Sequence, residues 1–200
     1  MVDQRPEDAA DMAEVLLYHH IQGLTDGVRA FADELRAAGH TVHTPDLFDG
    51  RTFDTIDAGF AFARETGFDA IRERGVAAAD DLGPDLVYAG FSFGVTIAQQ
   101  LAQTRGGARG ALLMYSCIPI SEFGPAWPDD VPVQIHGKEG DEFFREDLPA
   151  ARELAGSAAS AELFLYPGDQ HLFADSSLDA YDPAAAALLL ERVTAFLAST

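Results

Sequence analysis

The stretch Leu86-Val87-Tyr88-Ala89-Gly90-Phe91-Ser92-Phe93-Gly94 decides the fold. The run 85–89 is short and apolar, which is typical of a buried strand, and a helical run over 95–103 follows directly after Gly94. Between them stands Gly-x-Ser-x-Gly, the pattern of a serine on a tight strand-to-helix turn. Bulky side chains two positions before or after the serine would collide with the neighbouring strand and helix. The stretch therefore predicts that the Ser92 hydroxyl projects from the carboxyl edge of a strand.

Outward from this unit, short β-rich runs alternate with Ala-rich stretches of helical period along the whole chain. This alternation is typical of repeated β–α units around a mostly parallel sheet. Thr25 and Asp182 are suited to cap the helices that follow them, and stretch 54–82 is expected to form two or three helical pieces, interrupted at Gly59, Gly67 and Gly75. The sequence predicts one α/β domain over residues 1–200, with strands at 15–19, 41–44, 86–89, 111–115, 131–136 and 162–166.

Charge and composition exclude several classes of function. The chain has 33 acidic and 13 basic side chains, a formal net charge of −20, and a hydrophobic content of 48% that is ample for a core. Such a negative chain is repelled by phosphate backbones and anionic lipid heads, so we expect neither a nucleic-acid nor a membrane partner. Cys117 stands alone, which excludes an intramolecular disulfide. The first fourteen residues lack the pattern of a secretory signal, so a cytoplasmic location is expected.

A serine hydroxyl needs a neighbouring base, and that base needs a carboxylate to orient it. On parallel sheets of this kind the three groups follow in the order serine, acid, histidine, each after a later strand. Asp141 follows the predicted strand 131–136, and His171 follows the strand 162–166. We therefore expect Ser92 as nucleophile, His171 as base and Asp141 as the orienting acid, with Glu139 and Glu142 as alternatives to Asp141.

Two backbone N–H groups are candidates to stabilise the oxyanion that forms on the substrate. Phe93 begins the helix after the serine, and Ile21 lies in the loop after the first predicted strand. The tandem histidines His19 and His20 precede Ile21, but adjacent positions of an extended chain point to opposite sides, and no second ligand cluster follows at metal spacing. We therefore expect no metal and no cofactor.

The substrate mouth is expected to be lined by one polar and four aromatic side chains, although core packing is an equal alternative for the aromatic ones. These residues are His20, Phe91, Phe123, Trp127 and Phe173. Phe93 and parts of the segment 53–68 are expected to contribute to the same lining.

The chain from about residue 15 to 197 resembles the dienelactone hydrolase family. The resemblance is carried by these motifs: His19-His20-Ile21-Gln22-Gly23; Arg36-Ala37-Ala38-Gly39-His40 leading into Thr44-Pro45-Asp46-Leu47-Phe48; Gly90-Phe91-Ser92-Phe93-Gly94; Asp141-Glu142-Phe143-Phe144; and Tyr166-Pro167-Gly168-Asp169-Gln170-His171-Leu172-Phe173. It implies a compact α/β-hydrolase fold with helices on both faces of the sheet and no large lid domain. It also implies hydrolysis of small esters or lactones.

The sequence departs from the family pattern at three places. The namesake enzymes carry a cysteine nucleophile, a glutamate in the loop after the first central strand and an arginine four residues beyond the catalytic histidine; Ser92, His20 and Asp175 stand there. The resemblance thus implies a serine hydrolase acting through an acyl-serine on esters, lactones or thioesters, and an acid at position 175 is expected to repel anionic substrates. Two alternatives stay open: a catalytically silent binding protein of this fold, and a hydrolase of peptide or carbon–carbon bonds. The sequence leaves the oligomeric state open.

Overall fold

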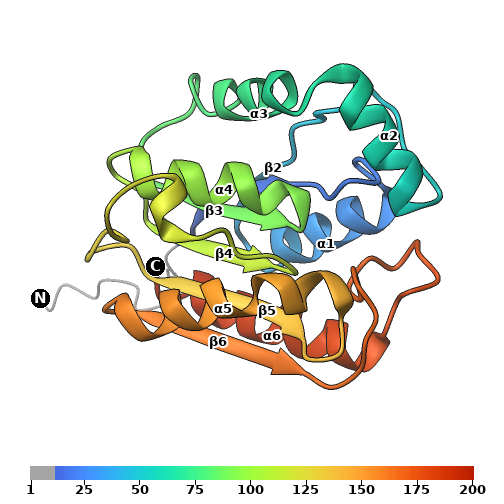
Figure 1. Cartoon of the computed structure of the whole chain (residues 1–200). Coiled ribbons are helices and arrows are strands. Elements are labelled where there is room, and N and C mark those ends of the chain that lie inside the picture. The colour runs from blue at the N-terminus through green and yellow to red at the C-terminus, as the bar shows by residue number, and fades with distance from the viewer. Residues whose placement is uncertain (1–11) are drawn as a thin grey trace, which may run out of the picture.

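The computed structural model describes residues 12–200, so most of the segment examined for a secretory signal lies outside the described residues. Six strands form one parallel sheet in the order β2-β1-β3-β4-β5-β6 (Figure 1). All six predicted strands are present, with ends that differ by at most two residues, which confirms the predicted parallel α/β sheet. The strands are β1 (Glu14–Tyr18), β2 (Thr41–His43), β3 (Leu86–Phe91), β4 (Gly110–Met114), β5 (Val133–Lys138) and β6 (Ala161–Tyr166).

Helices cover both faces of this sheet because successive strand residues point to opposite sides. Leu16 and Tyr18 of β1 enter a core beneath α3, α4 and α5, whereas Val15 and Leu17 enter a second core beneath α1 and α6. Figure 1 shows α4 and α5 on the near face of the sheet. The helices are α1 (Asp26–Ala37), α2 (Ile56–Thr66), α3 (Phe68–Ala77), α4 (Phe93–Thr104), α5 (Glu142–Ser157) and α6 (Pro183–Leu197), with a short 3-10 helix at Ile120–Glu122.

The capping predictions are confirmed: the Thr25 side chain caps α1 and the Asp182 side chain caps α6. The prediction for the glycines of 54–82 is only partly right. Gly67, at a φ of 94°, separates α2 from α3, but Gly59 and Gly75 lie inside these helices. At Gly75 a Cβ would lie 2.6 Å from the Ile97 side chain of α4, so this glycine allows two helices to approach closely rather than ending one.

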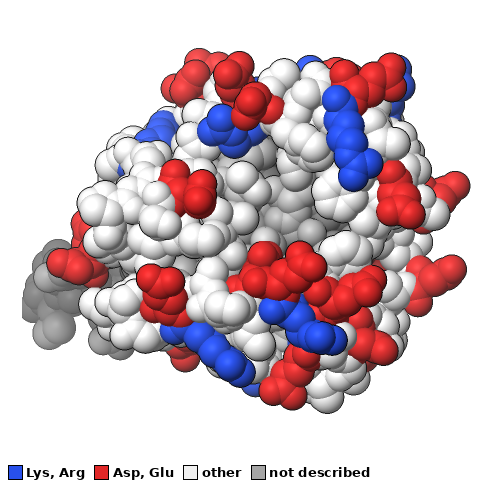
Figure 2. Space-filling view, in the orientation of Figure 1, with Lys and Arg blue, Asp and Glu red and all other residues white. Residues whose placement is uncertain are grey.

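The surface reflects the acidic composition. Figure 2 shows a hollow of mostly uncharged residues on the face drawn, with Asp and Glu side chains along its lower rim and both acidic and basic side chains above it. Within residues 12–200, no helix combines the length and the apolar character needed to cross a bilayer.

Candidate active site

Ser92 lies on a strained turn at the carboxyl end of β3. Its φ is 48° and its ψ is −111°, a backbone conformation that residues other than glycine rarely adopt. Its N–H donates to the Met114 carbonyl at 2.7 Å. A Cβ on Gly90 would lie 2.5 Å from the Gly94 carbonyl, and a Cβ on Gly94 would lie 2.6 Å from the Tyr18 carbonyl. Only glycine therefore fits at positions 90 and 94, because a larger residue would collide with the neighbouring backbone, as the sequence predicted.

Hydrogen bonds join Ser92, His171 and Asp141 in one chain. Ser92 Oγ lies 2.8 Å from His171 Nε2, and His171 Nδ1 lies 2.6 Å from Asp141 Oδ2. Because the carboxylate can only accept, Nδ1 carries the proton, and Nε2 is left to accept the serine hydroxyl. Glu139 and Glu142, the alternatives considered for the acid, are both exposed. The structure thus brings together the three residues that were predicted from their order along the chain, and the acid that contacts His171 is Asp141.

Asp141 also caps helix α5. Its Oδ1 accepts the Phe143 N–H at 3.0 Å while Oδ2 faces His171, so the first turn of the helix fixes one carboxylate oxygen and leaves the other for the histidine. The Phe143 ring packs against the imidazole, with centroids 4.8 Å apart, and is 39% exposed. Sequence reasoning missed Phe143 as a wall of the site, although its place two residues after the expected acid was the available signal.

Lys138, the sole lysine of the chain, holds the loop that carries His171. It ends β5 with its side chain fully buried, and its ammonium donates to Gln170 Oε1 and to Asp182 Oδ2, each at 2.7 Å. The hydrogen bond from Lys138 lowers the pKa of the Asp182 carboxyl. This ammonium therefore ties the residue next to His171 to the start of α6.

The two expected oxyanion donors follow two neighbouring strands of the sheet, Ile21 after β1 and Phe93 after β3. Phe93 is the first residue of α4, where a backbone N–H has no partner within the helix. No acceptor within residues 12–200 pairs with the Ile21 N–H. The loop around Ile21 is held firmly, because Gln22 and Phe53 exchange two hydrogen bonds of 2.9 Å, and because Gly59 of α2 lies directly against the Ile21 carbonyl.

An open cleft of about 430 Å³ lies beside His171. Four carboxylate side chains line it, and no lysine or arginine is among its lining residues. A substrate that reaches His171 through this cleft meets a negative field. The lining residues are Gln22, Asp54, Thr55, Ile56, Asp57, Glu142, Phe143, His171, Leu172, Leu178, Asp179 and Ala180.

None of the five side chains expected to line the substrate mouth is among these residues, and neither is Phe93, whereas residues 54–57 of the expected segment 53–68 do line the cleft. Phe173 and His20 are fully buried, and Phe91 is 3% exposed. Trp127 is 5% exposed within the core beneath α4 and α5, and Phe123 is half-buried after the 3-10 helix. The alternative of core packing therefore holds for Phe91 and Phe173, which belong to the second core, and for Trp127, which belongs to the first.

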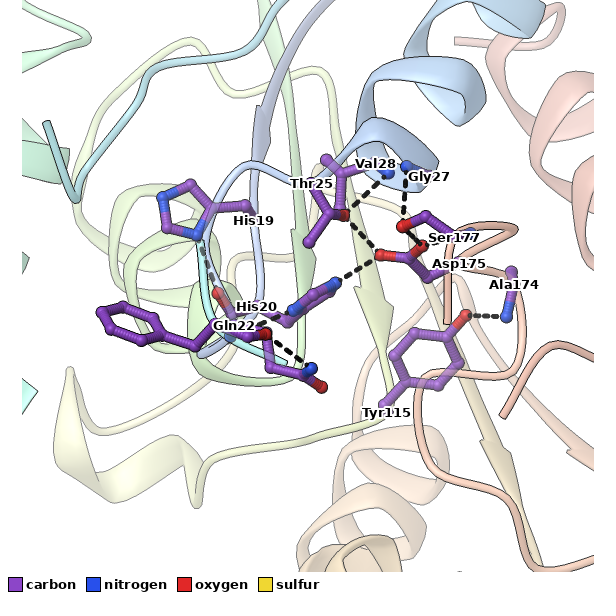
Figure 3. A network of polar contacts seen from close by, with 11 residues as sticks. His19, His20, Gln22, Thr25, Gly27, Val28, Tyr115, Ala174, Asp175 and Ser177 are labelled. Atoms are coloured by element: carbon purple, nitrogen blue, oxygen red, sulfur yellow. Dashed lines mark hydrogen bonds and ion pairs between the residues drawn. The ribbon is translucent and has the colours of Figure 1, made fainter. Parts of the chain in front are cut away.

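Asp175 does not face the cleft either, so it cannot repel an anionic substrate by direct contact. It is 4% exposed and bonded to His20, whose Nε2 lies 2.8 Å from Asp175 Oδ2 (Figure 3). Burial alone would raise the pKa of the Asp175 carboxyl, but hydrogen bonds from His20, Ser177 and Thr25 outweigh it and lower the pKa to about 2. Two of the three positions that depart from the family pattern, His20 and Asp175, thus form one buried pair.

His19, the other tandem histidine, is a buried structural group. Its Nδ1 donates to the His20 carbonyl at 2.7 Å, and its Nε2 accepts the Leu47 N–H at 3.1 Å. Burial lowers the pKa of His19 to about 4, so its ring stays neutral near pH 7. Burial also raises the pKa of the Cys117 thiol to about 12, which keeps it protonated. Across residues 12–200, no three His, Cys, Asp or Glu side chains gather in a way that could hold a metal ion.

The parallel sheet, the serine elbow after β3 and the acid and histidine after β5 and β6 define an α/β-hydrolase fold. The family model described as "Dienelactone hydrolase family" matches residues 3–200, and the chain belongs to this family. No curated protein sequence matches the chain.

Several solved structures share this fold. A dienelactone hydrolase-like promiscuous phosphotriesterase from metagenomic libraries is 16% identical, with a TM-score of 0.71 over 94% of this chain and 86% of that one. A dienelactone hydrolase from Anabaena variabilis is 16% identical, with a TM-score of 0.66 over 92% and 84%. A cold-adapted esterase from an Arctic intertidal metagenomic library is 18% identical, with a TM-score of 0.61 over 94% and 84%. At these identities the likeness concerns the fold.

Proposed function

We propose that this chain is a serine hydrolase of small carboxylic esters, lactones or thioesters that works through an acyl-serine intermediate and needs no cofactor. The observation that carries the proposal is the unbroken hydrogen-bond chain from Ser92 through His171 to Asp141, with the histidine at the wall of an open cleft. Membership of a hydrolase family supports the same class of reaction.

In this mechanism the Ser92 oxygen attacks the carbonyl carbon and passes its proton to His171 Nε2. The carbonyl oxygen becomes an oxyanion, which the N–H groups of Ile21 and Phe93 stabilise. Collapse of the tetrahedral intermediate breaks the ester bond, and the leaving alcohol takes the proton from His171. A water molecule then attacks the acyl-serine by the same steps and releases the acid. Asp141 keeps His171 in the Nδ1–H tautomer throughout.

The cleft favours neutral or cationic substrates over anionic ones. Its carboxylates, from Asp54, Asp57, Glu142 and Asp179, are exposed, so each acts through a screened field rather than through a fixed ion pair. Repulsion of anions was expected from Asp175, which is buried, so these four exposed side chains supply the repulsion instead.

Hydrolysis of p-nitrophenyl acetate and butyrate by the purified chain tests the reaction. We expect turnover by the wild-type chain and by Ser157→Ala, whose hydroxyl lies on the exposed end of α5, and a loss of at least about 10³-fold in Ser92→Ala. A fluorophosphonate should label the wild-type chain and Ser157→Ala but not Ser92→Ala.

Absence of both turnover and labelling in the folded wild-type chain would contradict the proposal and favour a silent binding protein. Labelling of Ser92 without turnover of any ester or lactone would favour a hydrolase of another bond.

A further inference from the structure

A second hydrogen-bond network lies behind the candidate active site, between the loop that carries Ile21 and the loop that carries His171 (Figure 3). Its centre is the pair of His20 and Asp175, whose side chains are 1% and 3% exposed. The space beside the pair, bordered by Gly27, Tyr115 and other residues, is too small to admit water. A water molecule therefore cannot enter this space to replace the hydrogen bond between His20 and Asp175.

Asp175 docks on the N-terminus of α1. Its Oδ2 accepts from His20 Nε2 and from the Thr25 hydroxyl, and its Oδ1 accepts from the Ser177 N–H at 2.9 Å and the Ser177 hydroxyl at 2.6 Å. Those two hydroxyls in turn accept the Val28 and Gly27 N–H groups, each at 3.2 Å. The carboxylate thus faces the positive end of the helix dipole, which stabilises its charge.

The absence of a side chain at Gly27 leaves room for Asp175 to pack against the start of α1. A Cβ at position 27 would collide with Asp175 Oδ1 and would come within 2.7 Å of the Ser176 N–H. The glycine stands in the first turn of α1 with no turn geometry that requires it, since its φ is not positive. Its contact with Asp175 is therefore the reason for a glycine at this position.

The hydrogen bonds of His20 fix the tautomer of its ring. Nδ1 accepts the Gln22 N–H at 3.2 Å, so the proton of the neutral ring must be on Nε2, from which it is donated to Asp175. The Gln22 N–H belongs to the peptide that directly follows Ile21. His20 therefore connects the backbone beside a proposed oxyanion donor to a side chain only four residues beyond His171.

Tyr115 braces the same loop from the opposite side. Its hydroxyl accepts the Ala174 N–H at 3.0 Å, and its ring and the His171 ring meet in an edge-to-face arrangement with centroids 5.7 Å apart. Tyr115 itself has a φ of 70°, a strained conformation directly after β4. The residues between His171 and Asp175 are thus held from both sides.

We propose that His20 and Asp175 are positioning residues that couple the two loops of the active site. Asp175 holds His20 as the Nε2–H tautomer, and Nδ1 then holds the Gln22 N–H so that the Ile21 N–H is presented to the oxyanion. This inference rests on the proposed function, because it assigns the Ile21 N–H that role. It predicts that breaking either end of the link lowers the rate of the chemical step rather than the affinity for substrate.

Two substitutions of His20 each remove one of its two hydrogen bonds, the one to Asp175 or the one to the Gln22 N–H. In His20→Asn the side-chain oxygen can replace Nδ1 as acceptor for Gln22 but cannot reach Asp175, whereas in His20→Gln the amide can replace the Nε2–H donor but leaves the Gln22 N–H unpaired. We expect each variant to lose roughly tenfold to hundredfold in kcat on p-nitrophenyl butyrate, with KM within about twofold, at temperatures where it is fully folded. Inhibition by a trifluoromethyl ketone, which forms a tetrahedral oxyanion, should weaken by the same factor.

His43→Gln is the matched control. His43 also pairs with an acid, Glu14, at 2.7 Å, but at the β2 edge of the sheet, so its replacement should leave kcat unchanged. Values of kcat within twofold of the wild-type value in both folded His20 variants would overturn the proposal.

Nitrogen-15 NMR of the wild-type imidazoles tests the same inference without any substitution. The His20 signals should report a neutral ring with the proton on Nε2, and a proton on Nδ1 would overturn the proposal even if no His20 variant folds. This measurement does not depend on turnover. Failure of the wild-type chain to hydrolyse any ester would instead contradict the proposed function.

Discussion

Two histidine–aspartate pairs share one loop, which supplies His171 to the first pair and, four residues later, Asp175 to the second. The pairs differ in what the second ring nitrogen of the histidine meets. His171 contacts Asp141 through Nδ1, and its Nε2 meets the Ser92 hydroxyl beside an open cleft. His20 contacts Asp175 through Nε2, and its Nδ1 meets a backbone N–H in the interior. The comparison teaches that an imidazole–carboxylate pair is suited to chemistry only where its free nitrogen faces a group that a substrate can reach.

The largest difference between the pairs should appear when each carboxylate is neutralised. Asp141→Asn should lower kcat by on the order of 10³–10⁴-fold, because the amide can favour the wrong tautomer of His171. Steady-state kinetics on a p-nitrophenyl ester measures this loss. Glu139→Gln, two residues away and exposed, should change kcat by less than twofold; a larger loss in Glu139→Gln than in Asp141→Asn would refute the assignment of the acid.

Neutralising the buried carboxylate should instead cost stability in a pH-dependent way. The folded pKa of Asp175 is about 2, below an ordinary value of roughly 3.9, so its charge stabilises the fold by about 2–3 kcal/mol above about pH 4. This contribution is lost as the pH falls from about 4 towards 2. Urea unfolding of Asp175→Asn should therefore show the full deficit at pH 7 and a smaller one at pH 3, and a deficit independent of pH would contradict the ionised state of Asp175.

Adding a methyl group beside the buried pair of His20 and Asp175 should have a smaller effect on stability. Gly27→Ala places a methyl group against Asp175 and should reduce the free energy of unfolding by about 1–3 kcal/mol. Gly156→Ala is the control, since Gly156 lies within α5 with no neighbouring atom near a new Cβ, and it should stabilise by about 0.5–1 kcal/mol. Thermal unfolding compares the two, and equal effects would show that Asp175 can yield to the methyl group.

The smallest expected effect concerns the charged side chains that line the cleft beside His171. Acetylcholine and its uncharged analogue 3,3-dimethylbutyl acetate have nearly the same shape, and we expect kcat/KM to be a few-fold higher for the cation at low salt. Glu142→Gln, beside Asp141, should reduce this preference, and 0.5 M NaCl should nearly remove it. A preference for the uncharged ester that salt does not change would show that the cleft carboxylates do not select substrates.

Much of the fold could be predicted because its signals are local. The glycines around Ser92, the cap at Thr25 and the short apolar strands each act within a few residues, and chain order then placed Asp141 and His171 at one edge. The lining residues could not be predicted in this way. Whether Phe91 or Phe173 faces a cleft or a core depends on which helix covers it, and that contact is made by distant parts of the chain.

The roles of one glycine and one acidic residue also depend on contacts with distant parts of the chain. Gly75 has the appearance of a helix break in the sequence, but it is a contact site for Ile97. Asp175 has the appearance of a substrate-facing acid, but it is buried because residues about 150 positions earlier, His20 and Thr25, supply its hydrogen bonds. A single sequence does not contain the signal that would join such distant positions.

The burial of Lys138 has a practical consequence for handling the protein. Because the sole lysine has a fully buried ammonium bonded to Gln170 and Asp182, the fold presents no accessible side-chain amine. Succinimidyl dyes, glutaraldehyde fixation and amine-coupled supports will therefore find no lysine to modify on the native surface. The many exposed carboxylates offer the alternative, and carbodiimide coupling through them is the suitable route for labelling or immobilising this chain.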